Sequence, residues 1–163
     1  MIIEVSGDIL LTKAKSIAHS VAPLDHFESG LALGLREKYP EMVKDFRHEG
    51  HVRRMKSGDI YEWTRSDGFK IFSLLVQEAA PSTHSHGLPG KANLHNLDKC
   101  LKQLASKLES ENISSLALPR VATGVGGLDW EDVRPHIYKY LDVLETKVYL
   151  YSKFIKSERA LET

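Results

Sequence analysis

Apolar residues at helical spacing form the strongest periodic pattern in the chain. Five leucines recur at intervals of three and four residues, which places them on one face of a helix. They are Leu94, Leu97, Leu101, Leu104 and Leu108. The spacing predicts a long amphipathic helix over residues 91–111.

Weaker apolar periods predict three further helical segments. One begins at Gly30 and ends before Pro40, because proline disrupts a continuing helix, and a second covers residues 41–49. A third is expected to begin near Val133, where the missing N–H of Pro135 costs least. Its apolar stripe continues toward the C-terminus.

Short apolar runs between these segments predict strands. They lie at residues 2–5, 16–21, 59–64, 69–76, 115–119 and 147–151. The run at 69–76 is apolar almost throughout, which is typical of a central strand, and the connection at Ser66-Asp67-Gly68 predicts a hairpin with the run before it. Alternating strands and helices indicate an α/β fold, a three-layer α/β/α sandwich with a mixed central sheet.

Length and composition fit a single domain. The chain has 163 residues, of which 42% are hydrophobic, and we assign residues 1–151 to one domain and residues 152–163 to a polar, frayed C-terminal tail. The 22 basic and 22 acidic residues cancel, so the summed charge provides no long-range attraction to nucleic acid or to an anionic membrane. Direct nucleic-acid binding and membrane insertion are not expected.

The single cysteine bears on the cellular compartment. Cys100 has no partner for an intrachain disulfide, which fits a reducing environment. We therefore expect a cytoplasmic protein.

The stretch from Leu116 to Val133 runs from an apolar strand through a glycine-rich turn into a helix. Glycines at 124, 126 and 127 allow positive φ angles and let backbone N–H groups approach an anion, which the positive end of the following helix also favours. A plain strand-to-helix turn would also use glycine. A second cradle of this kind is expected at Ser29-Gly30, and two cradles suit a ligand with a central diphosphate.

Three motifs in order resemble the macrodomain, the ADP-ribose-binding fold. They are Gly7-Asp8-Ile9 after the first strand, the loop that opens the Gly30 helix, and Leu118-Pro-Arg-Val-Ala-Thr-Gly-Val-Gly-Gly-Leu-Asp-Trp130. The last is similar to the motif of the subgroup that contains terminal ADP-ribose glycohydrolases, bacterial DNA ADP-ribosyl glycohydrolase antitoxins and the yeast-type ADP-ribose 1″-phosphate phosphatase.

The resemblance implies a role for each matching residue. Asp8 would accept a hydrogen bond from the adenine amino group, with Ile9 beside it. The residues expected on the diphosphate and distal ribose are Ser29, Gly30 and Leu31 on one side and Thr123, Gly124, Val125, Gly126 and Gly127 on the other. His19 matches a histidine of close relatives. Asp8 as a turn cap and His19 as a structural residue are the alternatives.

The chain departs from the resemblance at catalytic positions. Where terminal ADP-ribose glycohydrolases carry an attacking lysine, this chain has Gln77 or Glu78, and the acid that works with that lysine falls near Gly126. The lysyl mechanism is therefore not expected. Glu28 stands where the family has glycine.

Acid and base chemistry is then left to the loop before the Gly30 helix. Asp25, His26 and Glu28 are the candidates to activate water, with solvated loop charges as the alternative. Phe27 is expected to contact a ribose or the adenine. No cofactor and no metal are expected, since the pair His84 and His86 has no third ligand nearby.

Two functions follow from these residues. The first is a hydrolase that binds ADP-ribose or a derivative and acts as an ADP-ribosyl glycohydrolase or an ADP-ribose 1″-phosphate phosphatase; its partner would be ADP-ribose or an ADP-ribosylated macromolecule. The second is a module that binds or sequesters ADP-ribose or a related NAD-derived nucleotide without catalysis.

Overall fold

A six-stranded sheet forms the centre of the molecule. The computed structural model describes residues 1–79 and 90–163, so the predicted pair His84 and His86 lies outside the described residues. The strands are β1 (Ile2–Gly7), β2 (Ser16–Ser20), β3 (Ile60–Thr64), β4 (Lys70–Leu74), β5 (Ser115–Pro119) and β6 (Lys147–Phe154). Their order is β1-β6-β5-β2-β4-β3, and β3 is antiparallel to β4 while the other neighbours are parallel. The predicted mixed sheet is confirmed.

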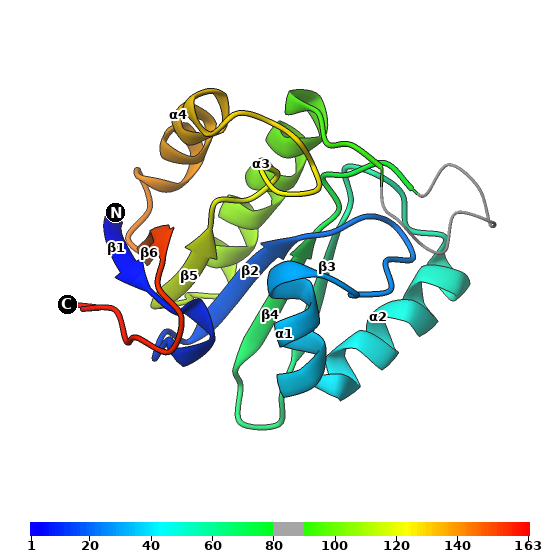
Figure 1. The fold of residues 1–163 in the computed structure, drawn as a ribbon, viewed down its shortest axis with the longest axis horizontal. Coiled ribbons are helices and arrows are strands. Elements are labelled where there is room, and N and C mark those ends of the chain that lie inside the picture. The colour runs from blue at the N-terminus through cyan, green and yellow to red at the C-terminus, as the bar shows by residue number, and fades with distance from the viewer. Residues whose placement is uncertain (80–89) are drawn as a thin grey trace.

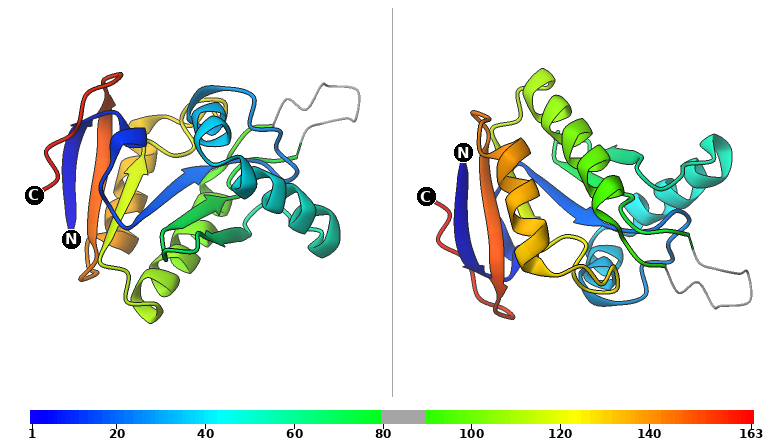
Figure 2. Two further views of the ribbon diagram at one scale, coloured as in Figure 1. Left: turned by 90° about the horizontal axis from the view of Figure 1, so that it is seen from below. Right: turned by 90° about the horizontal axis from the view of Figure 1, so that it is seen from above.

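Helices cover both faces of the sheet. They are α1 (Gly30–Lys38), α2 (Pro40–Arg53), α3 (Leu94–Ser110) and α4 (Trp130–Leu141), and a short 3₁₀ helix, η1 (Ile9–Leu11), follows β1. One apolar cluster joins α3 and α4 to the sheet and a second joins α1 and α2 to its other face, so the predicted three layers are present (Figures 1 and 2).

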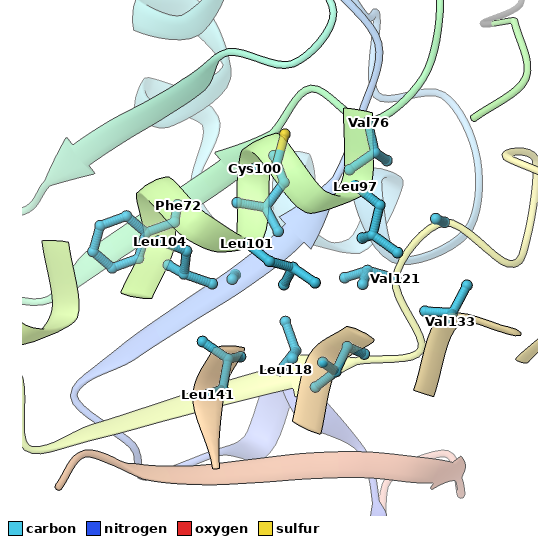
Figure 3. Close-up of a cluster of buried hydrophobic side chains, with 14 of the residues drawn as sticks. Phe72, Val76, Leu97, Cys100, Leu101, Leu104, Leu118, Val121, Val133 and Leu141 are labelled. Atoms are coloured by element: carbon cyan, nitrogen blue, oxygen red, sulfur yellow. The ribbon is translucent and has the colours of Figure 1, made fainter. Parts of the chain in front are cut away.

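The leucine stripe of the sequence builds the larger of the two clusters. Leu97, Leu101 and Leu104 of α3 are fully buried, and they face Phe72 of β4 and Leu118 of β5 (Figure 3). The helix begins where the Asn93 side chain accepts a hydrogen bond from the Asn96 N–H at 2.8 Å. Burial of this leucine stripe stabilises the packing of α3 against the sheet.

Particular residues define the turn of the β3–β4 hairpin and the two ends of α2. Gly68, with φ of +96°, closes the hairpin as its N–H donates to Arg65 O at 2.9 Å. Pro40 starts α2 at a position where its missing N–H costs little, and Arg54 ends the helix in the left-handed region. The predicted hairpin and the helix break at Pro40 are both confirmed.

The start of α4 differs from the prediction. The helix begins at Trp130 rather than near Val133, with Asp129 in an extended conformation before it. Pro135 is therefore the sixth residue of the helix and removes one backbone hydrogen bond. The apolar contacts of Val133, which is fully buried in the α3–α4 cluster, outweigh that loss.

The C-terminal tail is not frayed, which corrects the prediction. Strand β6 continues past Tyr151 to Phe154, and the following residues run back along β1, so both chain ends lie beside β1 and β6 (Figure 1). Glu162 accepts hydrogen bonds from the Lys13 N–H and the Tyr151 hydroxyl at 2.9 and 2.7 Å. The tail is held by polar contacts and has no periodic apolar pattern, so its ordered course could not be predicted from the sequence.

Across the described ranges, no helix has both the length and the apolar character that crossing a membrane requires.

Candidate functional site

A cleft of about 920 Å³ opens at the carboxyl ends of the parallel strands. Its walls come from the ends of β1, β2, β5 and β6, the first turn of α1 and the loop after β5. The predicted residues that line it are Asp8, Ile9, His19, Asp25, Ser29, Gly30, Leu31, Thr123, Gly124, Val125 and Gly126. In α/β sheets this edge is the usual ligand site, since loops from several strands meet there.

Asp8 lies at the β1 end of the cleft and caps the turn that follows the strand. Its Oδ1 accepts from the Leu10 N–H at 3.1 Å, and its Oδ2 accepts from the Ser157 N–H at 3.0 Å. The Asp8 N–H in turn donates to Glu158 O at 2.7 Å. A carboxylate oxygen accepts more than one hydrogen bond, so the cap leaves acceptor capacity for a ligand. Contact with adenine stays a prediction.

An aromatic residue that the sequence analysis missed lies beside Asp8. Phe154, at the end of β6, pairs in register with Gly7, lines the cleft and is 66% exposed. A large exposed aromatic ring at a cleft wall offers a flat apolar surface for a base. The pairing of β6 with β1 shifts register between Tyr151 and Lys153, so an alternating pattern in the sequence does not lead to Phe154.

The loop after β5 presents a row of backbone N–H groups. Ala122 and Gly127 have φ of +67° and +79°, and the Gly127 N–H donates to Gly124 O at 3.1 Å, which folds the loop into a tight turn. In the described part of the chain, the N–H groups of Thr123, Gly124, Val125 and Gly126 have no hydrogen-bond partner. Successive free N–H groups in such a turn form an anion-binding concavity.

The first turn of α1 forms the second wall of this concavity. Ser29 precedes the helix in an extended conformation and its side chain makes no capping hydrogen bond. Gly30 has φ of +57°, which favours glycine at this position. The orphan N–H groups of a first helical turn, together with the positive end of the helix dipole, favour an anion. The two predicted cradles therefore border one cleft.

His19 is a buried, neutral residue at the end of β2. Its Nε2 lies 2.7 Å from Ser73 Oγ, its ring packs against Phe27 with centroids 5.4 Å apart, and 1% of the residue is exposed. Burial lowers the pKa of His19 to about 3 from an ordinary value of 6.5. Within the described residues its Nδ1 has no hydrogen-bond partner. These contacts fit the structural role that was the alternative for His19. His19 also lines the cleft.

Acid should destabilise the protein through His19. Because the folded pKa is below the unfolded one, the unfolded state binds more protons between pH 6.5 and about 3, and stability is lost as the pH falls through that window. At pH 5 the loss from this group is about 2 kcal/mol. Urea unfolding at pH 7 and pH 5 would show a smaller pH dependence for His19→Gln than for the parent. Equal dependence in both proteins would contradict this origin.

The three acid and base candidates do not form a cluster in the cleft. Asp25 lines it and is buried, but its Oδ2 and Oδ1 accept from the N–H groups of Ala22 and Phe27 at 3.0 and 2.8 Å. His26 and Glu28 are not among the described lining residues, and Glu28 is exposed. Gly127 is also absent from the described lining residues. Asp25 therefore lines the cleft and at the same time stabilises its own loop through these hydrogen bonds. Catalytic roles for His26 and Glu28 stay predictions.

Phe27 was predicted to contact a ligand, and that prediction is wrong. The residue is fully buried and its ring meets that of Phe46 at a centroid distance of 5.2 Å. A positive φ of 56° turns its side chain into the α1–α2 cluster. The polar residues on either side of Phe27 in the loop predicted an exposed side chain rather than a buried one.

Gln77 occupies the wall near the distal end of the cleft. It is buried and lines the cleft, and its amide donates to Gly90 O at 3.2 Å. An amide nitrogen is not nucleophilic, so this residue does not replace an attacking lysine. Among the described residues, no group of three or more His, Cys, Asp and Glu side chains is placed to hold a metal ion.

Comparisons with known proteins agree on one family. The Macro domain model matches residues 24–137. A DNA ADP-ribosyl transferase-DNA ADP-ribosyl glycohydrolase fusion protein of Thermosipho africanus is 24% identical over 157 residues, which cover 90% of this chain and 40% of that protein. ADP-ribose glycohydrolase OARD1 of Homo sapiens is 26% identical over 152 residues, which cover 91% and 89%.

A solved structure matches the fold. The macrodomain of Thermus aquaticus DarG superimposes with a TM-score of 0.81 at 21% identity, covering 93% of this chain and 98% of that one. The chain spans about two fifths of the bacterial fusion protein but most of the human relative. The family model covers well over half of the 163 residues, and the chain belongs to the Macro domain family.

Proposed function

We propose that this protein binds ADP-ribose in the cleft and hydrolyses the bond that joins ADP-ribose to a modified macromolecule. The observation that carries the proposal is the pair of facing anion cradles, the 123–126 loop and the first turn of α1, on one cleft. The relatives named above are ADP-ribosyl glycohydrolases, which supports hydrolysis as the reaction.

The ligand is oriented by the two ends of the cleft. Adenine lies at the β1 end, with its amino group toward Asp8 and its face toward Phe154. The diphosphate is held between the two sets of backbone N–H groups, which stabilise negative charge through the backbone itself. The distal ribose then lies toward Asp25 and Gln77.

Water is the nucleophile in this proposal. Its oxygen attacks the anomeric carbon of the distal ribose, the bond to the modified group breaks, and that group takes a proton from solvent as it leaves. Asp25 is the one acidic residue of the distal wall in the described lining, and its carboxylate orients the water and accepts its proton. Positioning of the diphosphate supplies the rest of the rate enhancement.

A non-catalytic binding module is the second candidate. Gln77 in place of a nucleophile and the two backbone hydrogen bonds already held by Asp25 favour it. Dephosphorylation of ADP-ribose 1″-phosphate is a third outcome that the same cleft admits by size.

Titration calorimetry with ADP-ribose, with AMP and NAD as controls, tests the binding site first. Micromolar affinity for ADP-ribose alone supports it, whereas no heat with any of the three ligands rejects it. Turnover of ADP-ribosylated DNA, ADP-ribosylated protein and ADP-ribose 1″-phosphate then separates the enzyme from the binding module. DNA belongs in this panel because of the bacterial relative, although the balanced charge of the chain predicts no affinity for unmodified DNA.

Two carboxylate variants assign the chemistry. Asp25→Asn is expected to lower turnover by about 10² to 10⁴-fold while ADP-ribose affinity persists, because the amide cannot take a proton from water. It should also lower the free energy of unfolding by about 1–3 kcal/mol, since one of the two loop N–H groups loses its acceptor. Glu28→Gln is the matched change on the same loop. Loss of turnover only in Glu28→Gln would transfer the role to Glu28, and loss in neither would favour the binding module.

A further inference from the structure

Two cations line the cleft on neighbouring strands. Lys153 lies on β6, two residues after Tyr151, and Arg120 directly follows Pro119 of β5, which pairs in register with Tyr151. The Arg120 guanidinium stacks over the Trp130 ring, with Cζ 5.0 Å from the ring centroid. This contact restricts the Arg120 side chain against the start of α4, since cation–π stacking limits the freedom of a long side chain.

Neither cation is neutralised within the part of the chain that the structure describes. No described acidic side chain forms an ion pair with Arg120 or Lys153. The acidic residues of the described lining are Asp8 and Asp25, and each already accepts two backbone N–H groups. The lining of the cleft therefore includes two exposed cations that have no ion-pair partner among the described residues.

A diphosphate does not account for these charges. The N–H groups at 123–126, which have no partner among the described residues, and the first turn of α1 already border the place assigned to it. The sheet order β1-β6-β5-β2 puts Lys153 and Arg120 on the two strands between the β1 end and β2. With adenine at β1, the adenosine ribose lies over these two strands.

We propose that the preferred ligand carries a further phosphate on its adenosine ribose and that Arg120 and Lys153 bind this phosphate. The proposal rests on the ADP-ribose orientation given above. The planar guanidinium suits two phosphate oxygens at once, and the flexible ammonium adds a point charge from the neighbouring strand. The ligand class is thus a phosphorylated ADP-ribose rather than ADP-ribose alone.

Calorimetry of the full chain with ADP-ribose and 2′-phospho-ADP-ribose tests the proposal. The phosphorylated ligand is expected to bind at least about tenfold more tightly, which corresponds to one charge-assisted contact of ordinary strength. The preference should fall when salt is raised to about 0.5 M, because both cations are exposed. Adenosine 2′,5′-bisphosphate and adenosine 3′,5′-bisphosphate, each compared with AMP, identify the hydroxyl that carries the phosphate.

A matched pair of double variants assigns the preference to the two cations. Arg120→Gln with Lys153→Gln should reduce the preference to less than about twofold, because the phosphorylated ligand loses far more affinity than ADP-ribose does. Lys156→Gln with Arg159→Gln removes the same charge from exposed tail positions outside the described lining and should keep the preference. Lys153→Gln alone, which leaves the Trp130 stack intact, should reduce the preference in part.

Three results would overturn the inference. Equal affinity of the parent for ADP-ribose and 2′-phospho-ADP-ribose, with neither bisphosphate bound more tightly than AMP, would show that no additional phosphate is recognised. An equal loss for both ligands in the Arg120 and Lys153 variant would show that the cations serve the diphosphate. Absence of ADP-ribose binding would reject the proposed function and this inference with it, whereas the first two results leave ADP-ribose binding standing.

Discussion

Replacing Asp8 with alanine is expected to weaken ADP-ribose binding by about 1–3 kcal/mol, the usual loss when a charged hydrogen-bond acceptor is removed. Asp8 lies at the β1 end of the cleft, and its carboxylate is fixed there by the N–H groups of Leu10 and Ser157. A fixed acceptor discriminates more sharply than a mobile one, because little side-chain entropy is lost on binding. Titration calorimetry of Asp8→Ala against the parent measures the loss.

A ligand change separates base recognition from the structural role of Asp8. Inosine diphosphate ribose has a carbonyl in place of the adenine amino group, so the parent should bind it more weakly than ADP-ribose. Asp8→Ala should bind the two ligands almost equally. If the substitution instead weakened both ligands by the same factor, Asp8 would act only by holding the η1 turn and the C-terminal tail in place.

The elements that the sequence predicted well are those with a strong apolar period. The leucines of α3 and the apolar run of β4 both report burial directly, and each forms part of a cluster on the sheet. The start of α4 depends on the burial of Val133 in the α3–α4 cluster, and the course of the tail after Phe154 depends on single hydrogen bonds between distant residues. Contacts between distant residues cannot be predicted from the local sequence pattern.

The site shows the same division. The glycine loop and the first turn of α1 were predictable because positions with a positive φ angle favour glycine, and these glycines are visible in the sequence. The inward turn of Phe27 was not, since a polar loop usually exposes its aromatic residue. Arg120, Lys153 and Phe154 were also missed, because exposed residues at strand ends have no periodic partner and meet only when the sheet aligns β5 with β6.

The loop after β5 allows a test in which two glycines two residues apart receive the same methyl group. A Cβ at Gly126 would lie 2.6 Å from Ala122 O and 3.0 Å from its carbonyl carbon, and these backbone atoms cannot turn away as a side chain would. A Cβ at Gly124 would meet no described heavy atom within 4 Å, and Gly124 does not have a positive φ. The two substitutions therefore differ in backbone strain and not in chemistry.

Gly126→Ala is expected to weaken ADP-ribose binding by at least about 1.4 kcal/mol, a factor of ten, because the loop must shift and its N–H groups then no longer converge on the diphosphate. It should also lower the free energy of unfolding by about 1–3 kcal/mol, the usual cost of overpacking, since Gly126 O anchors the Ala92 N–H at 2.9 Å ahead of α3. Gly124→Ala should leave that free energy unchanged or raise it by about 0.4–1 kcal/mol through the unfolded chain. Urea unfolding and calorimetry of both variants measure these differences. Equal unfolding free energies for the two variants, or full ADP-ribose affinity in Gly126→Ala, would mean that the loop relaxes freely and that the diphosphate is held elsewhere.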